Sequence, residues 1–450
     1  MTIPVRQRVG TALALLLALA ACSRSAPELP EGPRAAPRWE RTPVIFVPGI
    51  NREVARLLRD SLLSLEPLTL RTDAETIAHL GDPRFASDLK PLNGAPPFDP
   101  EKLRATAVRA MQGLVDHLTR EEGYVRAGPA DPTDKDFPEN AKAVRADRTR
   151  PGNLYVWYYD WRRDNVETAC LLADLVESIR AATGARQVLL VGHSMGGIVI
   201  RYYLRYGGRD VLRGRDCPLG SGDRHARINR PGAEAVAGAV FLGVPHRGSA
   251  LAFRTLVSDF TLWRVLPVTL REPVFSMPSA WQLLPRGRTD GTVPLLVEAG
   301  GEGVRDVPLY TPRTWTERHW IFADWSDPAR RVFLAAMLGR AEAFQRSLDG
   351  LRNPAEAKTP RLNVYSACRP TLARAVLTPE GLRFAGRDDR DDPFYGRTYD
   401  PGDGVVTEAS VHLPAAPSLE TLQTCASHNG YHEDPGVVRD VVAFLARHGR

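Results

Sequence analysis

The stretch QVLLVGHSMGGIVIRYYLRY, residues 187–206, carries three consecutive patterns. Its first five residues are continuously apolar and rich in Val and Leu, which is typical of a parallel strand buried on both faces. Residues 192–196 read Gly-His-Ser-Met-Gly, and the apolar run 198–206 indicates a buried helix. A strand, a sharp turn and a helix in this order predict a nucleophile elbow that holds Ser194 above the sheet.

The glycines of this pentapeptide have a steric reason. The turn forces Ser194 into a strained backbone conformation, and a Cβ atom two residues to either side would collide with its surroundings. The same turn directs the backbone N–H of Met195 toward a developing oxyanion. His193 is interpreted as a packing residue, because adjacent side chains in such a turn diverge. The alternative is an ordinary Gly-rich turn between a strand and a helix.

The composition describes a large folded chain. With 450 residues and 43% hydrophobic content, it can bury an extensive core, as one elaborated domain or as two to three small ones. The net charge is +6, but the basic residues are mostly Arg, scattered among acids, with no dense run and no interleaved aromatics. Nucleic acid is therefore not expected as a partner.

The N-terminus has the pattern of an export signal. Arg6 and Arg8 precede an apolar run over residues 11–21 that is too short to span a bilayer. The pattern predicts a secretory signal peptide over residues 1–21.

The end of that run, Leu-Ala-Ala-Cys, resembles a bacterial lipobox, so Cys22 is expected to carry the lipid anchor. By the same resemblance, Ser23 would permit sorting to an outer membrane. The Pro-rich and Ala-rich segment 22–41 then forms a tether. We expect an exported protein attached to a membrane surface in the cell envelope. The alternative is a plain cleaved signal with an incidental cysteine.

The remaining four cysteines are an even number, which suits an oxidising compartment and allows three pairings. We favour Cys368 with Cys425, because both should lie near the carboxyl ends of late strands. This choice leaves Cys170 with Cys217. Free buried thiols are the alternative.

Strand and helix patterns alternate on both sides of the elbow, which argues for a mostly parallel sheet with helices on both faces. The expected strands are 43–47, 154–159, 187–191, 235–242 and 361–367. Such a sheet, combined with the elbow, predicts an α/β-hydrolase fold with core segments 42–249 and 361–450.

Two regions interrupt this alternation. Residues 67–150 form an insertion with its own amphipathic helix, and residues 250–360 are expected to form a cap or lid. Tryptophans there could line a pocket for a lipophilic substrate or form the ordinary core of a second lobe. These tryptophans are Trp263, Trp281, Trp315, Trp320 and Trp325.

A catalytic acid and base are expected late in the chain. Asp403 lies between two glycines just before an apolar pair, and Asp400 is the alternative acid. His428 lies on the loop before the final helix, and His432 is the alternative base. The order Ser194, Asp403, His428 is that of α/β-hydrolases.

The loop after the first strand should supply a second oxyanion donor, the N–H of Ile50. The acidic run Asp388, Asp389, Asp391 and Asp392 matches no calcium-binding spacing and is interpreted as a solvated loop. We therefore expect neither a metal ion nor an organic cofactor.

The chain resembles the lecithin:cholesterol acyltransferase family in several motifs. These are PVIFVPG (43–49), YDWR (159–162), GHSMGG (192–197), LGVPHRGS (242–249) and GDG (402–404). The resemblance implies a nucleophile, an acid, a base and two oxyanion donors at Ser194, Asp403, His428, Ile50 and Met195.

From these residues we expect a serine acyl hydrolase or O-acyltransferase that acts on lipid esters, either phospholipid or acylglycerol. One alternative is a carboxylesterase or triacylglycerol lipase without transferase activity. The alternative from another class is an envelope lipoprotein that uses the hydrolase fold only for binding.

Overall fold

The computed structural model covers most of the chain after the tether. It describes residues 40–50, 111–127, 152–157, 159, 161–258, 274–275, 277–287, 293–301, 303–321, 328–349 and 354–449. The expected signal peptide, Cys22, Trp263, Trp325 and most of the insertion lie outside these residues.

A six-stranded, all-parallel sheet forms the centre of the fold, in the order β12-β7-β4-β3-β1-β2. Its apolar strands are almost wholly buried, as the continuous Val and Leu runs predict. The strands are β1 (Val44–Val47), β2 (Leu154–Val156), β3 (Val188–His193), β4 (Val236–Leu242), β7 (Arg361–Ser366) and β12 (Leu419–Thr424).

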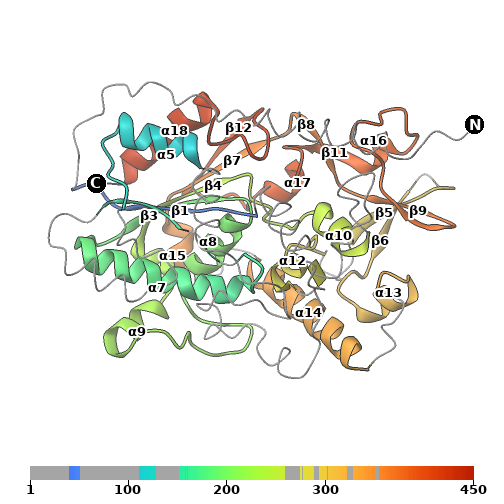
Figure 1. Cartoon of the computed structure of the whole chain (residues 1–450), viewed down its shortest axis with the longest axis horizontal. Helices are drawn as coiled ribbons and strands as arrows, with labels where there is room; N and C mark the ends of the chain where they lie inside the picture. Colours follow the sequence, from blue (N-terminus) through green and yellow to red (C-terminus); the bar gives the residue numbers. More distant parts are fainter. Residues whose placement is uncertain are drawn as a thin grey trace, which may run out of the picture.

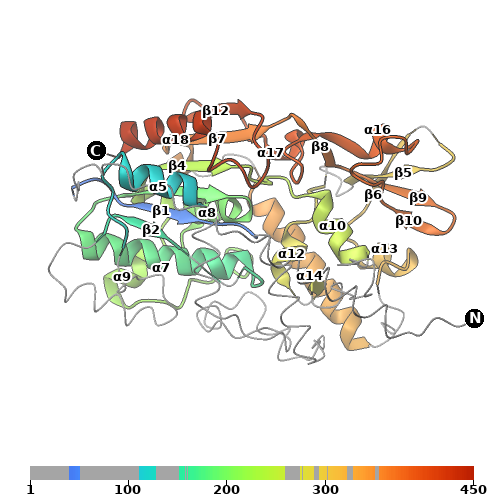
Figure 2. The same cartoon turned by 45° about the horizontal axis from the view of Figure 1, so that its top comes forward.

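Helices cover both faces of this sheet. They are α5 (Gln112–Arg120), α7 (Asn165–Thr183), α8 (Met195–Tyr206), α9 (Gly222–Ile228) and α18 (Pro435–His448). Figure 2 shows α5 and α18 on one face and α7 with α9 on the other, and α8 packs against both α7 and the strands. The sequence therefore predicted the fold class correctly: this is an α/β-hydrolase architecture.

A second lobe lies beside the carboxyl ends of the strands, on the right in Figure 1. Its helices are α10 (Ala250–Val257), α12 (Pro278–Gln282), α13 (Pro312–Glu317) and α14 (Pro328–Ser347). Its sheet, in the order β10-β9-β5-β6, consists of β5 (Val293–Glu298), β6 (Val304–Val307), β9 (Ala375–Thr378) and β10 (Gly381–Arg383).

The lobe is not confined to residues 250–360, where the sequence placed the cap. Strand β5 pairs in parallel with β9, so residues beyond the expected boundary contribute to the same small sheet. A separate two-stranded sheet joins β8 (Arg369–Leu372) to β11 (Tyr399–Gly402). Shorter helices complete the fold: η3 (Gly232–Ala235), α15 (Pro354–Lys358), α16 (Tyr395–Thr398) and α17 (Glu408–Val411).

Three of the expected tryptophans form the core of this lobe. Trp281 and Trp315 are fully buried, with ring centroids 5.1 Å apart, and Trp320 packs edge-on against Phe253 at 4.9 Å. For these three residues, the interpretation as ordinary core is therefore the correct one.

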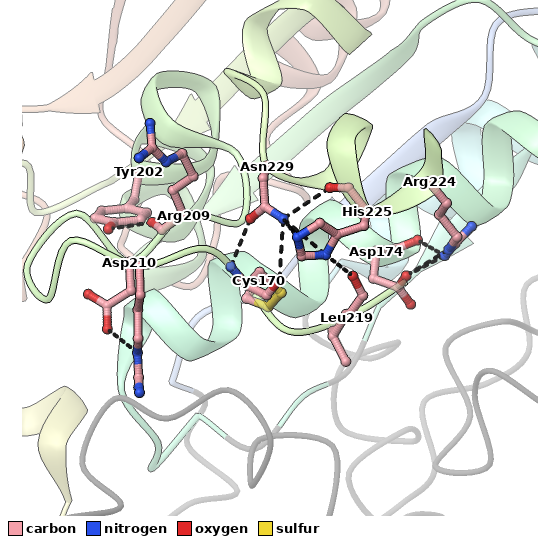
Figure 3. Close-up of a disulfide and its surroundings, with 11 residues drawn as sticks. Cys170, Asp174, Tyr202, Arg209, Asp210, Leu219, Arg224, His225 and Asn229 are labelled. Atoms are coloured by element: carbon pink, nitrogen blue, oxygen red, sulfur yellow. Dashed lines mark hydrogen bonds and ion pairs between the residues drawn. A yellow bond between two sulfur atoms is a disulfide. The ribbon is translucent and has the colours of Figure 1, made fainter. Parts of the chain in front are cut away.

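Two disulfides cross-link the described residues in the pairing favoured from the sequence. Cys170 of α7 is bonded to Cys217 in the loop after α8, as Figure 3 shows, and Cys368 is bonded to Cys425. The first ties the polar loop and α9 to the sheet-covering helix α7. Within the described ranges, no helix is both long and apolar enough to cross a membrane.

Candidate active site

The elbow between β3 and α8 has the strained geometry that its sequence predicts. Ser194 has φ 53° and ψ −128°, and it is one of two non-glycine residues with positive φ in the described chain. A Cβ on Gly192 would lie 2.7 Å from the Cα of Gly197, and one on Gly196 would overlap the carbonyl oxygen of Val47. Larger residues at these positions would push the serine out of place.

Three side chains from distant parts of the chain meet at this elbow. The Nε2 atom of His428 lies 3.0 Å from the Oγ atom of Ser194, and its Nδ1 atom lies 2.8 Å from Oδ2 of Asp403. All three side chains are buried. Ser194 follows β3 and His428 follows β12 of the central sheet, whereas Asp403 follows β11 of the separate two-stranded sheet.

Each carboxylate oxygen of Asp403 accepts two hydrogen bonds. Its Oδ1 atom accepts hydrogen bonds from the backbone N–H groups of Val405 and Val406, at 2.9 and 2.8 Å. Its Oδ2 atom accepts from His428 and from the hydroxyl of Tyr431, the latter at 3.1 Å. Burial alone would raise the pKa of Asp403, but His428 and the hydrogen bonds from the backbone of Val406 and Val405 hold that pKa below its ordinary value. The group therefore stays ionised beside the imidazole.

His193, which the sequence indicated as a packing residue, also holds the histidine loop. Its Nε2 atom donates to the backbone carbonyl of His428 at 2.7 Å, and the two rings lie 4.8 Å apart. Burial, followed by the proximity of His428, lowers the pKa of His193 to about 3. A neutral ring with its proton on Nε2 satisfies this contact. The hydrogen bond itself left no signal in the sequence.

The alternative acid and base lie elsewhere. Asp400 forms a bidentate ion pair with Arg374, with both N···O distances 2.9 Å. His432 lies 3.5 Å from Glu433 through its Nε2 atom, and burial lowers the pKa of His432. Neither residue forms a hydrogen bond with Ser194 or His428 within the described structure.

The loop after β1 packs directly against the elbow. A Cβ on Gly49 would lie 2.5 Å from the Cβ of Ser194 and 3.0 Å from the backbone nitrogen of Met195. The next residue, Ile50, continues this loop, and Met195 is the first residue of α8. The assignment of their backbone N–H groups as oxyanion donors stays a prediction.

Tyr159, the first residue of the YDWR motif, supports that loop. Its buried hydroxyl donates to the carbonyl of Pro48 at 2.7 Å. Sequence reasoning placed Tyr159 in an expected strand and in the YDWR motif but gave it no role at the site, and the strand β2 ends at Val156. The motif's position just after an aromatic strand was the signal that could have identified this support.

Position 243, in the LGVPHRGS motif, has a steric reason to be glycine. It has φ 55°, and a Cβ there would lie 2.5 Å from Cε2 of Tyr431 and 2.8 Å from Oδ2 of Asp403. Sequence reasoning assigned no role to Gly243 or Tyr431, because Gly243 lies 160 positions before Asp403 and 188 before Tyr431, and no local pattern marks these contacts.

The first three members of the acidic run, Asp388, Asp389 and Asp391, are exposed. The last member, Asp392, forms an ion pair with Arg383. In the part of the chain that is described, no group of three His, Cys, Asp or Glu residues is arranged to hold a metal ion.

Residues 142–293 match the family described as Lecithin:cholesterol acyltransferase. No curated protein sequence matches the chain. Among similar solved structures, a chain of the Tle4-Tli4 complex is 14% identical, with coverage of 91% of this chain and 99% of that one and a TM-score of 0.45.

Two other similar structures are the mature lipase BlEst2 of Bacillus licheniformis and a putative aryl esterase from Burkholderia cenocepacia. The first is 13% identical, covers 92% of this chain and 96% of its own, and has a TM-score of 0.34. The second is 14% identical, covers 92% of both chains, and has a TM-score of 0.29.

The family match includes YDWR, GHSMGG and LGVPHRGS, whereas the strand motif at 43–49 and the GDG at 402–404 lie outside it. The central parallel sheet and the elbow supply the fold independently of the match. The chain thus has an α/β-hydrolase fold, and its residues 142–293 match the lecithin:cholesterol acyltransferase family.

Proposed function

We propose that this protein is a serine-dependent acyl hydrolase or O-acyltransferase that acts on lipid esters, phospholipid or acylglycerol. The observation that carries the proposal is the chain of contacts from Ser194 through His428 to Asp403, at 3.0 and 2.8 Å. A nucleophile, a base in contact with it and an acid that orients the base are the three groups that acyl transfer through a serine requires.

In the first half-reaction, Oγ of Ser194 attacks the ester carbonyl while Nε2 of His428 takes the hydroxyl proton. The carboxylate of Asp403 keeps Nδ1 protonated and stabilises the imidazolium. The N–H groups of Met195 and Ile50 stabilise the tetrahedral oxyanion. The oxyanion collapses, the ester C–O bond breaks, and His428 returns the proton to the leaving alcohol. Ser194 then carries the acyl group.

In the second half-reaction, water or another alcohol attacks the acyl-enzyme, and His428 again takes and returns the proton. Exclusion of water decides which acceptor is used. The second lobe begins beside the site, because Ser249 both caps α10 and donates to the carbonyl of Val405, at 3.0 Å. This lobe is therefore well placed to select the acceptor.

The experiment supplies the purified protein with mixed phospholipid and triacylglycerol vesicles, with and without an added alcohol, and identifies the products. We expect fatty acid from one of the two lipids, an added ester product if transfer occurs, and a loss of at least ~10³-fold for Ser194→Ala. Ser221→Ala, an exposed serine before α9, is the matched control and should keep full activity.

The alternatives give different results in the same experiment. A lipase without transferase activity yields only free acid when the alcohol is present. A protein that only binds lipid yields no product, and a fluorophosphonate probe leaves Ser194 unlabelled. Turnover by Ser194→Ala at the parent rate would disprove the mechanism.

A further inference from the structure

We infer that Tyr431 is a positioning residue for the acid of this site: its hydroxyl orients the Asp403 carboxylate and tunes the basicity of His428. The inference rests on the proposed function and adds a fourth side chain to it. Tyr431 lies three residues after His428 and is fully buried. Its hydroxyl donates to Oδ2 of Asp403 at 3.1 Å, the same oxygen that accepts from His428.

The direction of this hydrogen bond follows from the charge of the acceptor. The pKa of Asp403 lies below its ordinary value, so its carboxylate is ionised and can only accept. The phenol proton of Tyr431 therefore points to Oδ2 of Asp403. Burial, together with the negative charge of Asp403, raises the pKa of Tyr431, so the hydroxyl keeps its proton.

The ring of Tyr431 packs directly against the backbone of Gly243. Its Cε2 atom occupies the space that a Cβ on Gly243 would need, at 2.5 Å. The ring therefore fits only because residue 243 is glycine, and the hydroxyl has a defined position relative to Asp403.

The carboxylate of Asp403 accepts four hydrogen bonds, two on each oxygen. A carboxylate has about four lone-pair positions, so every donor shares its charge with the others. Tyr431 and His428 share Oδ2 in particular. Removing the phenol donor leaves more negative charge for the imidazolium, so we expect the pKa of His428 to rise.

Other ionisable groups lie near Tyr431 and His428, and their titration must be distinguished in any pH-dependent measurement. They are His193 from β3, His432 and Glu433 from the same loop as Tyr431, and Arg387, whose guanidinium lies over Gly404. His193 stays neutral above pH 3, since burial lowers its pKa to about 3. A measurement on His428 itself distinguishes its titration from that of His432.

The first test compares Tyr431→Phe with Tyr202→Phe by steady-state kinetics on a soluble p-nitrophenyl ester over a range of pH. Tyr202 is the matched control, because it is a buried tyrosine whose hydroxyl also donates one hydrogen bond, to the carbonyl of Arg209. Figure 3 shows Tyr202 and Arg209 near the first disulfide. The contacts of the Tyr202 side chain are with Arg209, Val211, Tyr206 and Phe344.

For Tyr431→Phe, we expect kcat to fall about tenfold with KM little changed, and the acid limb of kcat/KM to move up by roughly 0.5 pH unit. Tyr202→Phe should leave that limb in place. A fall in kcat with no movement of the limb, or the same movement in both variants, would overturn the inference and reduce Tyr431 to a packing residue.

The second test reads the pKa of His428 directly by NMR titration of ¹⁵N-labelled histidine, which needs no turnover. An inactive parent protein would then contradict the proposed function, while an unchanged His428 pKa in Tyr431→Phe would contradict the present inference. Replacement of Tyr431 by 3-fluorotyrosine keeps the ring and covers the case in which the Phe variant does not fold. Its more acidic hydroxyl is a stronger donor, so the pKa of His428 should fall, and a rise or no change would count against the inference.

Discussion

The central sheet and the second lobe are both densely packed, but they are held by different forces. The central strands bury continuous apolar runs and pair with one another through a regular parallel ladder. The lobe has an aromatic core of its own, and buried polar contacts attach it to the sheet. Arg340 of α14 pairs with Asp164, the N-cap of α7, and Gln282 of α12 donates to the same carboxylate at 2.8 Å.

A second polar attachment involves the elbow helix itself. Arg205 of α8 pairs with Glu356 and donates to the carbonyls of Ser347 and Asp349. Arg201, one turn earlier, donates to the carbonyl of Leu348 at 2.8 Å. Helix α8, which begins directly after Ser194, therefore also holds the end of the lobe helix α14, so the candidate site and the lobe share one supporting helix.

The largest expected effect is on the rate of ester hydrolysis at the candidate site. Asp403→Asn keeps the shape of the acid but removes the charge and permits the wrong imidazole tautomer, so we expect kcat to fall by about 10⁴-fold. Asp400→Asn, three residues earlier and paired with Arg374, should change kcat little. Ester hydrolysis rates of both variants test this. Equal losses would mean that the loop as a whole, and not the acid, supports activity.

The next effect concerns the attachment of the lobe. Arg340→Ala leaves the buried carboxylate of Asp164 without its cation, which should lower the free energy of unfolding by about 3–5 kcal/mol. Arg313→Ala, at an exposed pair with Glu317, should leave that free energy unchanged. Urea titration measures both. If the two variants were equally stable, the polar attachment would contribute nothing and the aromatic core alone would hold the lobe.

The smallest expected effect is a pH dependence of the free energy of unfolding, caused by His193 at the end of β3. The unfolded chain protonates His193 near pH 6.5, whereas the folded protein does so only near pH 3. The folded state therefore loses stability as the pH falls from 6.5 toward 3, by about 2 kcal/mol between pH 6.5 and pH 5.

His193→Gln checks this assignment, because glutamine can donate to the same carbonyl but does not titrate. Urea unfolding at several pH values should show a shallower loss of stability below pH 6.5 for this variant. An identical pH dependence in parent and variant would assign the effect to other groups, such as His246, whose pKa burial also lowers well below its ordinary value.

Local patterns predicted much of the sheet and the elbow. The strands at β1, β3, β4 and β7 lie within a residue or two of the expected ranges, because a buried parallel strand needs a continuous apolar run wherever it occurs. The exception is β2, which ends at Val156 although the aromatic pattern continues to Tyr159. A pattern of apolar residues cannot mark where backbone pairing stops.

The amino-acid sequence by itself determined the order of five central strands and the helices between them, the strained serine turn and the chain order of Ser194, Asp403 and His428, because each is recognised from residues close together in the chain. Only the tertiary structure decided that His428 rather than His432 meets Ser194, that Tyr431 and Gly243 frame Asp403, and that β9 joins the lobe. These choices depend on contacts between segments tens to hundreds of residues apart, and the register of the folded sheet fixes those contacts, whereas a local pattern does not.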